Sequence, residues 1–375
     1  MKILVVAPDF PYPPNHGGRV DIWERIKKLH AFGAQVDLVY TSYEDERAEH
    51  LAEVLRFVGQ IIPVKRLKDV FYLFGLRPYQ VASRKNLMEV QLQQQYDYII
   101  LESEYVIDFA LNDTGSAKLA LRVHNDEVSY YQALCNSSKS ITKKMYYYLE
   151  AQLFKRNKKE YFKRVDFALY ISPEEMEKNA ARNYGQAYYY PPDLSFTNFK
   201  TTRPENQRVL FVGNLFTANN IDGLLWYIEH VHDKVAAQFP EYELVVAGNT
   251  KGKNIQHVLN KARIIFYDSP ANLDEIYAQA AVFINPMLSG AGVKLKTLNA
   301  VAEGLPVVST TVGTEGTGLN HEQHCLIANT AESFAHHVGA LLENPQLGSH
   351  LTAQAQDFLR QNFDNAKRFQ TIFKH

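Results

Sequence analysis

Cysteine is scarce in this sequence: Cys135 and Cys325 are the two among 375 residues. They lie far apart, and neither belongs to a CxxC pair or to a cluster with metal-ligand spacing. We therefore expect no disulfide framework and no zinc ribbon. A thiol content of this kind is typical of the cytoplasm, where we expect to find the protein.

Long apolar runs are also missing, since no stretch approaches the ~20 residues that a membrane-spanning helix needs. The N-terminal segment MKILVVAPDFPYPP is interrupted at Pro8 and Asp9, so it is too short for a signal-peptide core and lacks a cleavage site. We interpret it as a first β-strand. Any membrane contact would then be peripheral, at the inner membrane face.

An excess of charge is lacking as well, because the formal net charge is -1. A duplex-binding protein normally carries a basic surplus, so we expect no nucleic-acid partner. The 46% of hydrophobic and 22% of charged residues are typical of a soluble globular protein. The length suits two domains of roughly 150–200 residues each.

Short runs rich in Val, Ile and Leu alternate with helical segments along the chain, and this pattern is typical of buried parallel strands joined by helical crossovers. It occurs twice, which predicts an α/β fold with two doubly wound, Rossmann-like domains. The predicted strands are 3–7, 35–42, 96–103, 119–125 and 165–172 in the first series, and 208–213, 242–249, 262–268, 281–286 and 306–311 in the second.

A Pro-Pro pair and a polar stretch separate the two series, so residues 191–207 are the expected linker between domains 1–190 and 208–354. The segment from about Ser349 to His375 has an apolar stripe and is predicted to be one helix. Such a tail could pack on either domain.

Ligands of doubly wound sheets bind outside the carboxyl ends of the strands, which directs attention to the loops that follow them. After the first strand, Gly17 and Gly18 begin a helix whose N–H groups could receive an anion, or they simply form a tight turn. His124 follows another strand, where it could hydrogen-bond a ligand or cap the next helix beside Asn125 and Asp126.

The strongest signal is GAGVKLKTLNAVAEGLPVVST, residues 290–310, which lacks the Gly-Lys-Ser/Thr of a P-loop. A glycine loop follows a strand and precedes a helix that ends at Gly304, so Lys294 is predicted in the first helical turn. Backbone N–H groups, the helix dipole and the ammonium would converge there on an anion, unless the lysine is only solvated. GTEGTGL, residues 313–319, follows the next predicted strand, so we expect it at the same carboxyl edge of the sheet.

Taken together, these motifs resemble a known family. The Gly-Gly loop, R-x-H-N-D-E, F-V-G-N-L and G-A-G-V-K-x-K with the following G-x-P-V-V-S-T are similar to the GT-B-fold, retaining glycosyltransferases of family 4, also called glycosyl transferases group 1. The resemblance covers nearly the whole chain. It implies two Rossmann-like domains facing each other across a cleft, a donor site mainly on the second, an acceptor site mainly on the first, and a C-terminal helix, about 355–375, that returns to the first.

The resemblance also implies the roles of single residues. His124, Gly18 and Lys294 would take part in catalysis, and the lysines would bind the diphosphate of a UDP- or GDP-sugar that serves as co-substrate, without a metal or other cofactor. The donor-binding residues would be Gly17, Gly18, Gly213, Asn214, Gly290, Ala291, Gly292, Val293, Lys294 and Asn299.

Two departures from the family pattern concern the donor site. Ala291 and Asn299 stand where many members carry two glutamates, and the usual Arg and Lys are absent from residues 213–220. Asn299 is expected to contact the ribose through its amide. Lys294, together with Lys296, could replace the missing cations.

Three functions are compatible with these residues. The first is a hexosyltransferase-like enzyme that moves a sugar, with retention, to a saccharide or lipid-linked saccharide acceptor. A nucleotide-sugar epimerase would need acid/base groups such as Glu102 and Glu104, and a catalytically silent binder would explain the missing glutamates.

The segment 140–164 carries eight Lys and Arg against Glu150 and Glu160. A basic helix of this kind, with Tyr and Phe, is expected either to contact an anionic membrane or to be a solvated outer helix.

Overall fold

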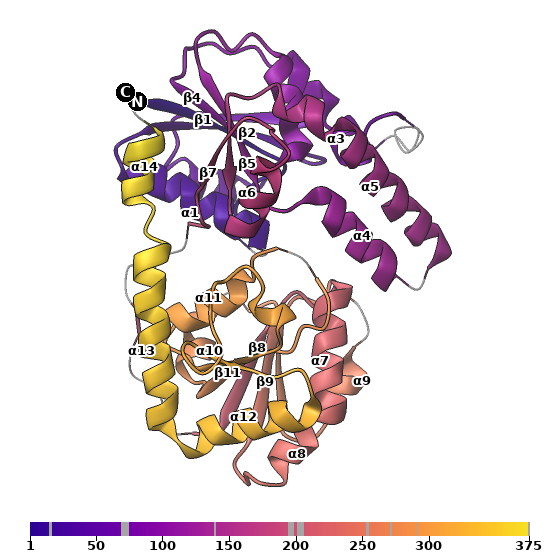
Figure 1. Cartoon of the computed structure of the whole chain (residues 1–375), viewed down its shortest axis with the longest axis vertical. Coiled ribbons are helices and arrows are strands. Elements are labelled where there is room, and N and C mark those ends of the chain that lie inside the picture. The colour runs from indigo at the N-terminus through magenta and orange to yellow at the C-terminus, as the bar shows by residue number, and fades with distance from the viewer. Residues whose placement is uncertain are drawn as a thin grey trace. The chain divides into compact units, whose positions relative to one another are not determined.

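The computed structural model describes the chain except for residues 15–16, 69–74, 139, 194–198, 201–205, 253–254, 271, 291 and 374–375. It divides into two compact units, which are Met1–Leu194 with Phe363–His375, and Ser195–Asn362 (Figure 1). Much of the expected linker, 191–207, lies outside the described residues.

The first unit is built on a seven-stranded sheet in the order β3-β2-β1-β4-β5-β6-β7, and all of its neighbouring strands pair in parallel. The five predicted strands are present. Two short strands at the two edges, β3 and β7, were not predicted. The strands are β1 Lys2–Ala7, β2 Gln35–Ser42, β3 Ile61–Lys65, β4 Tyr98–Leu101, β5 Lys118–Val123, β6 Phe167–Tyr170 and β7 Gln186–Tyr189.

Helices cover both faces of this sheet. Alternate residues of β1 point to opposite faces, so Val5 packs with Ile26 of α1 on one face and Val6 packs with Phe154 of α5 on the other. The helices are α1 Gly17–Ala31, α2 Ala48–Val54, α3 Tyr79–Ala82, α4 Glu127–Ser137, α5 Ile141–Phe162, α6 Pro173–Ala180 and α14 Ala366–Ile372, with 3₁₀ helices η2 Lys85–Glu89 and η3 Glu104–Leu111.

The second unit has a six-stranded sheet in the order β10-β9-β8-β11-β12-β13, again with parallel neighbours. Its strands are β8 Arg208–Val212, β9 Glu243–Gly248, β10 Ile264–Asp268, β11 Val282–Asn285, β12 Val307–Ser309 and β13 Leu326–Ile327. Its helices are α7 Ala218–His230, α8 His232–Ala236, α9 Gln256–Leu259, α10 Asp274–Ala278, α11 Leu295–Ala302, α12 Ala331–Glu343 and α13 Pro345–Asn362, with the 3₁₀ helix η4 Val312–Thr314.

Both sheets therefore show the doubly wound strand order, and the predicted fold class is confirmed. The strand order reverses between β1 and β4 in the first unit and between β8 and β11 in the second. The loops after these strands are thus the places where a doubly wound sheet holds its ligand.

The end of the chain differs from the prediction of one helix over 349–375, because α13 ends at Asn362 and α14 begins at Ala366. The side-chain amide of Asn365 donates hydrogen bonds to the carbonyl of Pro191 and to Asp193, and these bonds fix the break. Phe369 and Phe373 then pack in the core of the first unit.

Within the described residues, no helix is both long and apolar enough to span a membrane.

Candidate functional site

Three loops at the carboxyl edge of the second sheet form the candidate donor site. They are residues 213–217 after β8, 286–294 after β11 and 310–318 after β12. The first loop lies so close to β9 that a Cβ on Gly248 would come within 1.9 Å of the Gly213 carbonyl oxygen. Only glycine fits at Gly248, because that oxygen belongs to the backbone and cannot move aside.

The second and third loops lie against each other. A Cβ on Gly316 would approach the Cα of Val293 to 3.0 Å, and Gly316 has a φ of 72°. Gly290 and Gly292, with φ of 136° and 79°, also adopt conformations that favour glycine. Ala291, predicted to bind the donor, lies outside the described residues.

Lys294 joins these two loops. Its ammonium donates a hydrogen bond to the carbonyl of Gly292 at 2.6 Å and pairs with Glu315 at 3.1 Å, and its side chain is 5% exposed. Lys294 is the N-cap of α11, whose first residue is Leu295, so the predicted place in the first helical turn is wrong by one residue. The non-helical backbone at the N-cap aims the side chain along the loop toward Glu315.

Lys296, two residues later, reaches α7, the helix that follows the first loop, instead. Its ammonium donates to the side-chain oxygen of Asn220 at 2.8 Å and lies 4.9 Å from the ring centroid of Phe211. Burial, with the neighbouring Lys294 ammonium, lowers the pKa of Lys296 to about 7. A lysine whose pKa lies near 7 is partly neutral at neutral pH, and it takes up a proton when an anion binds beside it.

Asn220 lies in the first turn of α7 and was not singled out from the sequence, although residues 213–220 were considered for cations and donor-binding side chains. Its amide nitrogen donates to the carbonyl of Asn214 at 3.1 Å, so Asn220 orders the loop and positions Lys296. The sequence feature that could have identified Asn220 is its place in the first turn of a helix that follows a glycine loop.

Two other predicted donor residues have different surroundings. The N–H of Gly213 donates to the carbonyl of Ala247 at 3.0 Å, so it continues the sheet ladder. Asn299 lies on α11 and is partly exposed, and its side-chain amide has no hydrogen-bond partner among the described residues.

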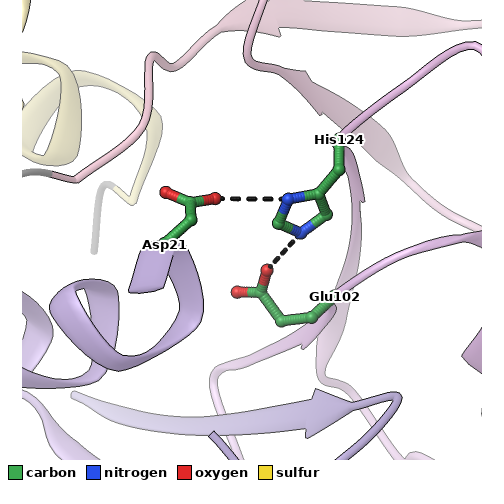
Figure 2. A group of neighbouring side chains, drawn as sticks. All are labelled: Asp21, Glu102 and His124. Atoms are coloured by element: carbon green, nitrogen blue, oxygen red, sulfur yellow. Dashed lines mark hydrogen bonds and ion pairs between the residues drawn. The ribbon is translucent and has the colours of Figure 1, made fainter. Parts of the chain in front are cut away.

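At the carboxyl edge of the first sheet, His124 lies between two carboxylates (Figure 2). Its Nε2 is 3.0 Å from Glu102, which follows β4, and its Nδ1 is 3.4 Å from Asp21 of α1. The ring can donate from both nitrogens only as the imidazolium. The alternative role as a helix cap is wrong, because the N-cap of α4 is Asp126 and the ring bonds elsewhere.

Two buried arginines complete this cluster. Arg25 pairs with Glu102 at 2.7 Å, with Asp21 at 2.6 Å and with Asp193 at 3.2 Å, and Arg122 pairs with Asp21 at 3.3 Å. Burial alone would raise the pKa of Asp21, but Arg25 and Arg122 outweigh it and lower the value to about 2. The cluster therefore holds three carboxyl groups and two guanidinium groups together with the His124 ring.

The ligand atoms of Asp21, Glu102 and His124 lie within 4.8 Å of one another, a spacing that could suit a cation. Because guanidinium groups already pair with both carboxylates, a metal ion would have to displace buried ion pairs. The donor set therefore does not fit a metal site. Glu102 is likewise engaged and is not available as a free acid or base.

The first unit also holds a pair of buried acids, Glu104 and Glu127. Glu104 follows β4 and Glu127 begins α4, and they are 2% and 4% exposed. Burial raises the pKa of Glu104 to about 7, and burial together with the Glu104 carboxylate raises that of Glu127 to about 8. The Tyr105 hydroxyl donates to Glu127 at 2.7 Å. Glu104 was a candidate acid/base group from the sequence, but no local pattern predicts its proximity to Glu127.

This pair makes stability depend on pH. The pKa of Glu127 in the folded chain exceeds its ordinary value of about 4.5, so the stabilisation is complete below that value and is lost as pH rises through about 8. We expect urea unfolding to show a loss of order a few kcal/mol between about pH 5.5 and 9. Glu127→Gln should make this loss smaller, whereas Glu160→Gln, an exposed control on α5, should leave it unchanged. Identical pH profiles for all three proteins would contradict the assignment.

A cavity of about 470 Å³ lies beyond β1 and β2 in the first unit. Its lining includes Asp9, Arg19, Tyr43 and Arg66, and the Arg66 guanidinium lies 4.7 Å from the ring centroid of Tyr43. Gly17 and Gly18 begin α1, as the sequence predicted, and both are exposed.

Comparison with known proteins defines the class to which this arrangement belongs. Residues 206–344 match the family model described as glycosyl transferases group 1. Crystal structures of GT-B glycosyltransferases are similar over the whole chain. A mutant of S. aureus TarM, in complex with fondaparinux, alpha-GlcNAc-glycerol and UDP, has a TM-score of 0.73 at 9% identity, with 100% of both chains covered.

Two further structures have the same fold. Sucrose-phosphate synthase from Thermosynechococcus elongatus has a TM-score of 0.70 at 16% identity, covering 100% of this chain and 98% of the other. HepE of Anabaena, in complex with UDP and glucose, has a TM-score of 0.65 at 16% identity, covering 99% and 98%. The chain thus has the GT-B glycosyltransferase fold.

A curated protein of Klebsiella pneumoniae, described as an uncharacterized 44.6 kDa protein in the cps region, is 41% identical over 391 residues, which cover 100% of this chain and 99% of that protein. The chain belongs to the same family as that protein, and its second unit carries the group 1 glycosyltransferase domain.

Proposed function

We propose that the protein transfers a sugar from a nucleoside-diphosphate sugar, such as a UDP- or GDP-sugar, to a saccharide or lipid-linked saccharide, with retention of configuration. The observation that carries this proposal is Lys296, a partly buried lysine with its pKa lowered to about 7, held by Asn220 at the strand-order reversal of the second sheet. A partly neutral lysine of this kind can take up a proton and become fully charged when an anionic ligand binds.

The diphosphate would be stabilised by the Lys296 ammonium and by the N-terminus of α11, both of which lie at the carboxyl edge of the sheet. Negative charge increases on the diphosphate as the sugar departs, so positive groups fixed beforehand favour the transition state. We propose that these groups supply the stabilisation without a metal ion. Lys294 would act indirectly, by holding the second and third loops together through Glu315.

The acceptor would bind on the first unit, and the 470 Å³ cavity is our candidate for its site. The cavity lining combines the Tyr43 ring with the charged side chains of Arg66 and Asp9, and groups of this kind can form hydrogen bonds with the hydroxyls of a sugar. The TarM complex named above contains saccharide ligands as well as UDP, and its likeness supports an acceptor of this chemical class.

The epimerase alternative loses one of its two candidate acid/base groups, because Glu102 is held by Arg25 and His124, and the other, Glu104, is buried at 2% exposed. The silent-binder alternative keeps one observation in its favour, which is Asn299 in place of a glutamate. Incubation with a panel of nucleotide sugars separates the three functions. Transfer or slow hydrolysis releases nucleoside diphosphate, epimerisation yields a new sugar, and a silent binder yields neither product. A silent binder would still be stabilised against unfolding by about 2.7 kcal/mol when the diphosphate is present at about 100 times its Kd.

His124 provides a second test. Its ring lies between Asp21 and Glu102 at the carboxyl edge of the first sheet, so we expect His124→Ala to lower turnover about ten- to a hundredfold while the Kd for UDP changes little. The readouts are kcat with the best donor and UDP affinity by calorimetry. His124→Gln, which offers one donor group in place of two, should fall between the two proteins. Unchanged turnover in folded His124→Ala would refute a role for the ring in the reaction.

A further inference from the structure

The outward face of α5 combines two properties, exposed apolar side chains and clustered positive charge. Helices α4 and α5 run side by side and form a hairpin on the first unit (Figure 1). The inward face of α5 is buried through residues such as Ala151, Phe154 and Tyr161. The opposite face is exposed along the length of the helix.

The first two turns of this outward face are apolar. Ile141, Met145, Tyr148 and Leu149 are 83%, 63%, 56% and 44% exposed. Their spacing of four, three and one residues places them on one side of the helix. The other large apolar side chains that are exposed in the described residues occur singly along the chain, at Leu55, Leu76, Met88, Leu111, Tyr267 and Leu288. A contiguous exposed patch of this kind marks an interaction surface.

The following turns of the same face are basic. Lys155, Arg156 and Lys159 lie 14, 15 and 18 positions after Ile141, which returns them to the same side of a helix with about 3.6 residues per turn. Lys143 and Lys144 stand at the apolar end, and Lys163 is the C-cap. All six are exposed, against Glu160 as the one exposed acid among the described residues of α5.

The structure also removes three charges from the sequence-based count, and one of them is Arg164, which is half-buried and pairs with Asp108. Lys158 is 1% exposed and pairs with Asp126, and Glu150 is 2% exposed and accepts the N–H of Tyr79. Both belong to the inward face. What remains outside is therefore one short apolar patch with Lys143 and Lys144 beside it, followed along the helix by a cluster of positive charge.

We propose that this face of α5 docks on an anionic lipid surface. The four apolar side chains enter the boundary between headgroups and acyl chains, and the basic side chains contact the phosphates of the headgroups. Charge complementarity selects a membrane, since a lipid surface presents both a layer of negative charge and an apolar interior. The proposal does not depend on sugar transfer and can be tested without it.

The test is flotation of the full-length chain with vesicles of phosphatidylcholine alone and of phosphatidylcholine with about 30% phosphatidylglycerol. We expect binding to the anionic vesicles at about 50 mM salt, release at about 500 mM, and little binding to the neutral vesicles. Absence of binding to anionic vesicles overturns the proposal. Equal binding to both compositions also overturns it, because the basic cluster would then play no part.

Two variants locate the surface. Ile141→Ser with Met145→Ser and Leu149→Ser should weaken binding at least about tenfold, and Lys155→Glu with Arg156→Glu and Lys159→Glu about a hundredfold. Matched controls change the same residue types elsewhere, as Leu55→Ser with Leu111→Ser, and as Lys118→Glu with Lys178→Glu and Lys367→Glu. These controls should bind as the unmodified chain does, and Tm values verify that each variant is folded.

Binding by the two α5 variants at the level of the unmodified chain would place the lipid contact elsewhere and overturn the assignment to α5. Self-association that Met145→Ser abolishes, with no vesicle binding, would assign the face to a second copy of the chain instead.

Discussion

Lys296→Met is expected to weaken binding of UDP or GDP about ten- to a hundredfold, the worth of one charge-assisted hydrogen bond. It is also expected to abolish proton uptake on binding. With its pKa near 7, Lys296 is mostly neutral at about pH 8, and a bound diphosphate would draw up to about one proton onto it. Calorimetry at that pH in two buffers with different ionisation enthalpies measures the proton directly.

Two controls separate this effect from a general loss of positive charge. Lys234→Met removes an exposed lysine of α8 in the same unit and should alter neither affinity nor proton uptake. Lys294→Met should disturb the loop pair formed with Glu315, and we expect a smaller loss of affinity with proton uptake retained. If Lys296→Met bound the diphosphate normally and still took up a proton, the cation of the site would have to be sought elsewhere.

Arg25→Met is expected to destabilise the first unit by about 3–5 kcal/mol, because it leaves Asp21, Glu102 and Asp193 buried without their shared partner. The sequence has two tryptophans, Trp23 in the first unit and Trp226 in the second. In a Trp226→Phe background, urea unfolding followed by fluorescence therefore reports on the first unit alone.

The matched control for this variant is Arg47→Met, an arginine whose side chain is 76% exposed, and it should change stability by less than about 0.5 kcal/mol. Asp193→Asn should cost less than Arg25→Met, because Arg25 keeps two carboxylates. A loss below about 1 kcal/mol for Arg25→Met would show that the buried charges do not depend on this guanidinium.

The hydrophobic pattern of the sequence predicted the central strands of both sheets but not all of the edge strands. The central strands were predicted because a strand covered on both faces must be apolar along its whole length, as ILVVA is in β1. The three strands that were not predicted are β3, β7 and β13, and each lies at an edge of its sheet. β3 contains Pro63, and β7 is the polar and aromatic QAYY, so neither carries that signal.

In the candidate donor site, too, some features were predictable from local sequence and others were not. The glycine loops were found from local sequence, since a turn that needs positive φ or close backbone approach demands glycine wherever it occurs. The choice between Lys294 and Lys296 was not accessible from the sequence, because one residue of helix rotates a side chain by about 100°. The capping geometry of α11 sends Lys294 to Glu315 and Lys296 to Asn220.

The sequence by itself thus determined the doubly wound fold, the loops that form the candidate donor site and the basic character of 140–164, because each depends on local composition and periodicity. Only the tertiary structure decided that His124 lies between Asp21 and Glu102, that Arg25 joins three carboxylates from distant parts of the chain, and which face of α5 remains exposed. Such contacts depend on which strands and helices become neighbours, and neighbours in a parallel sheet are separated by whole crossovers of chain.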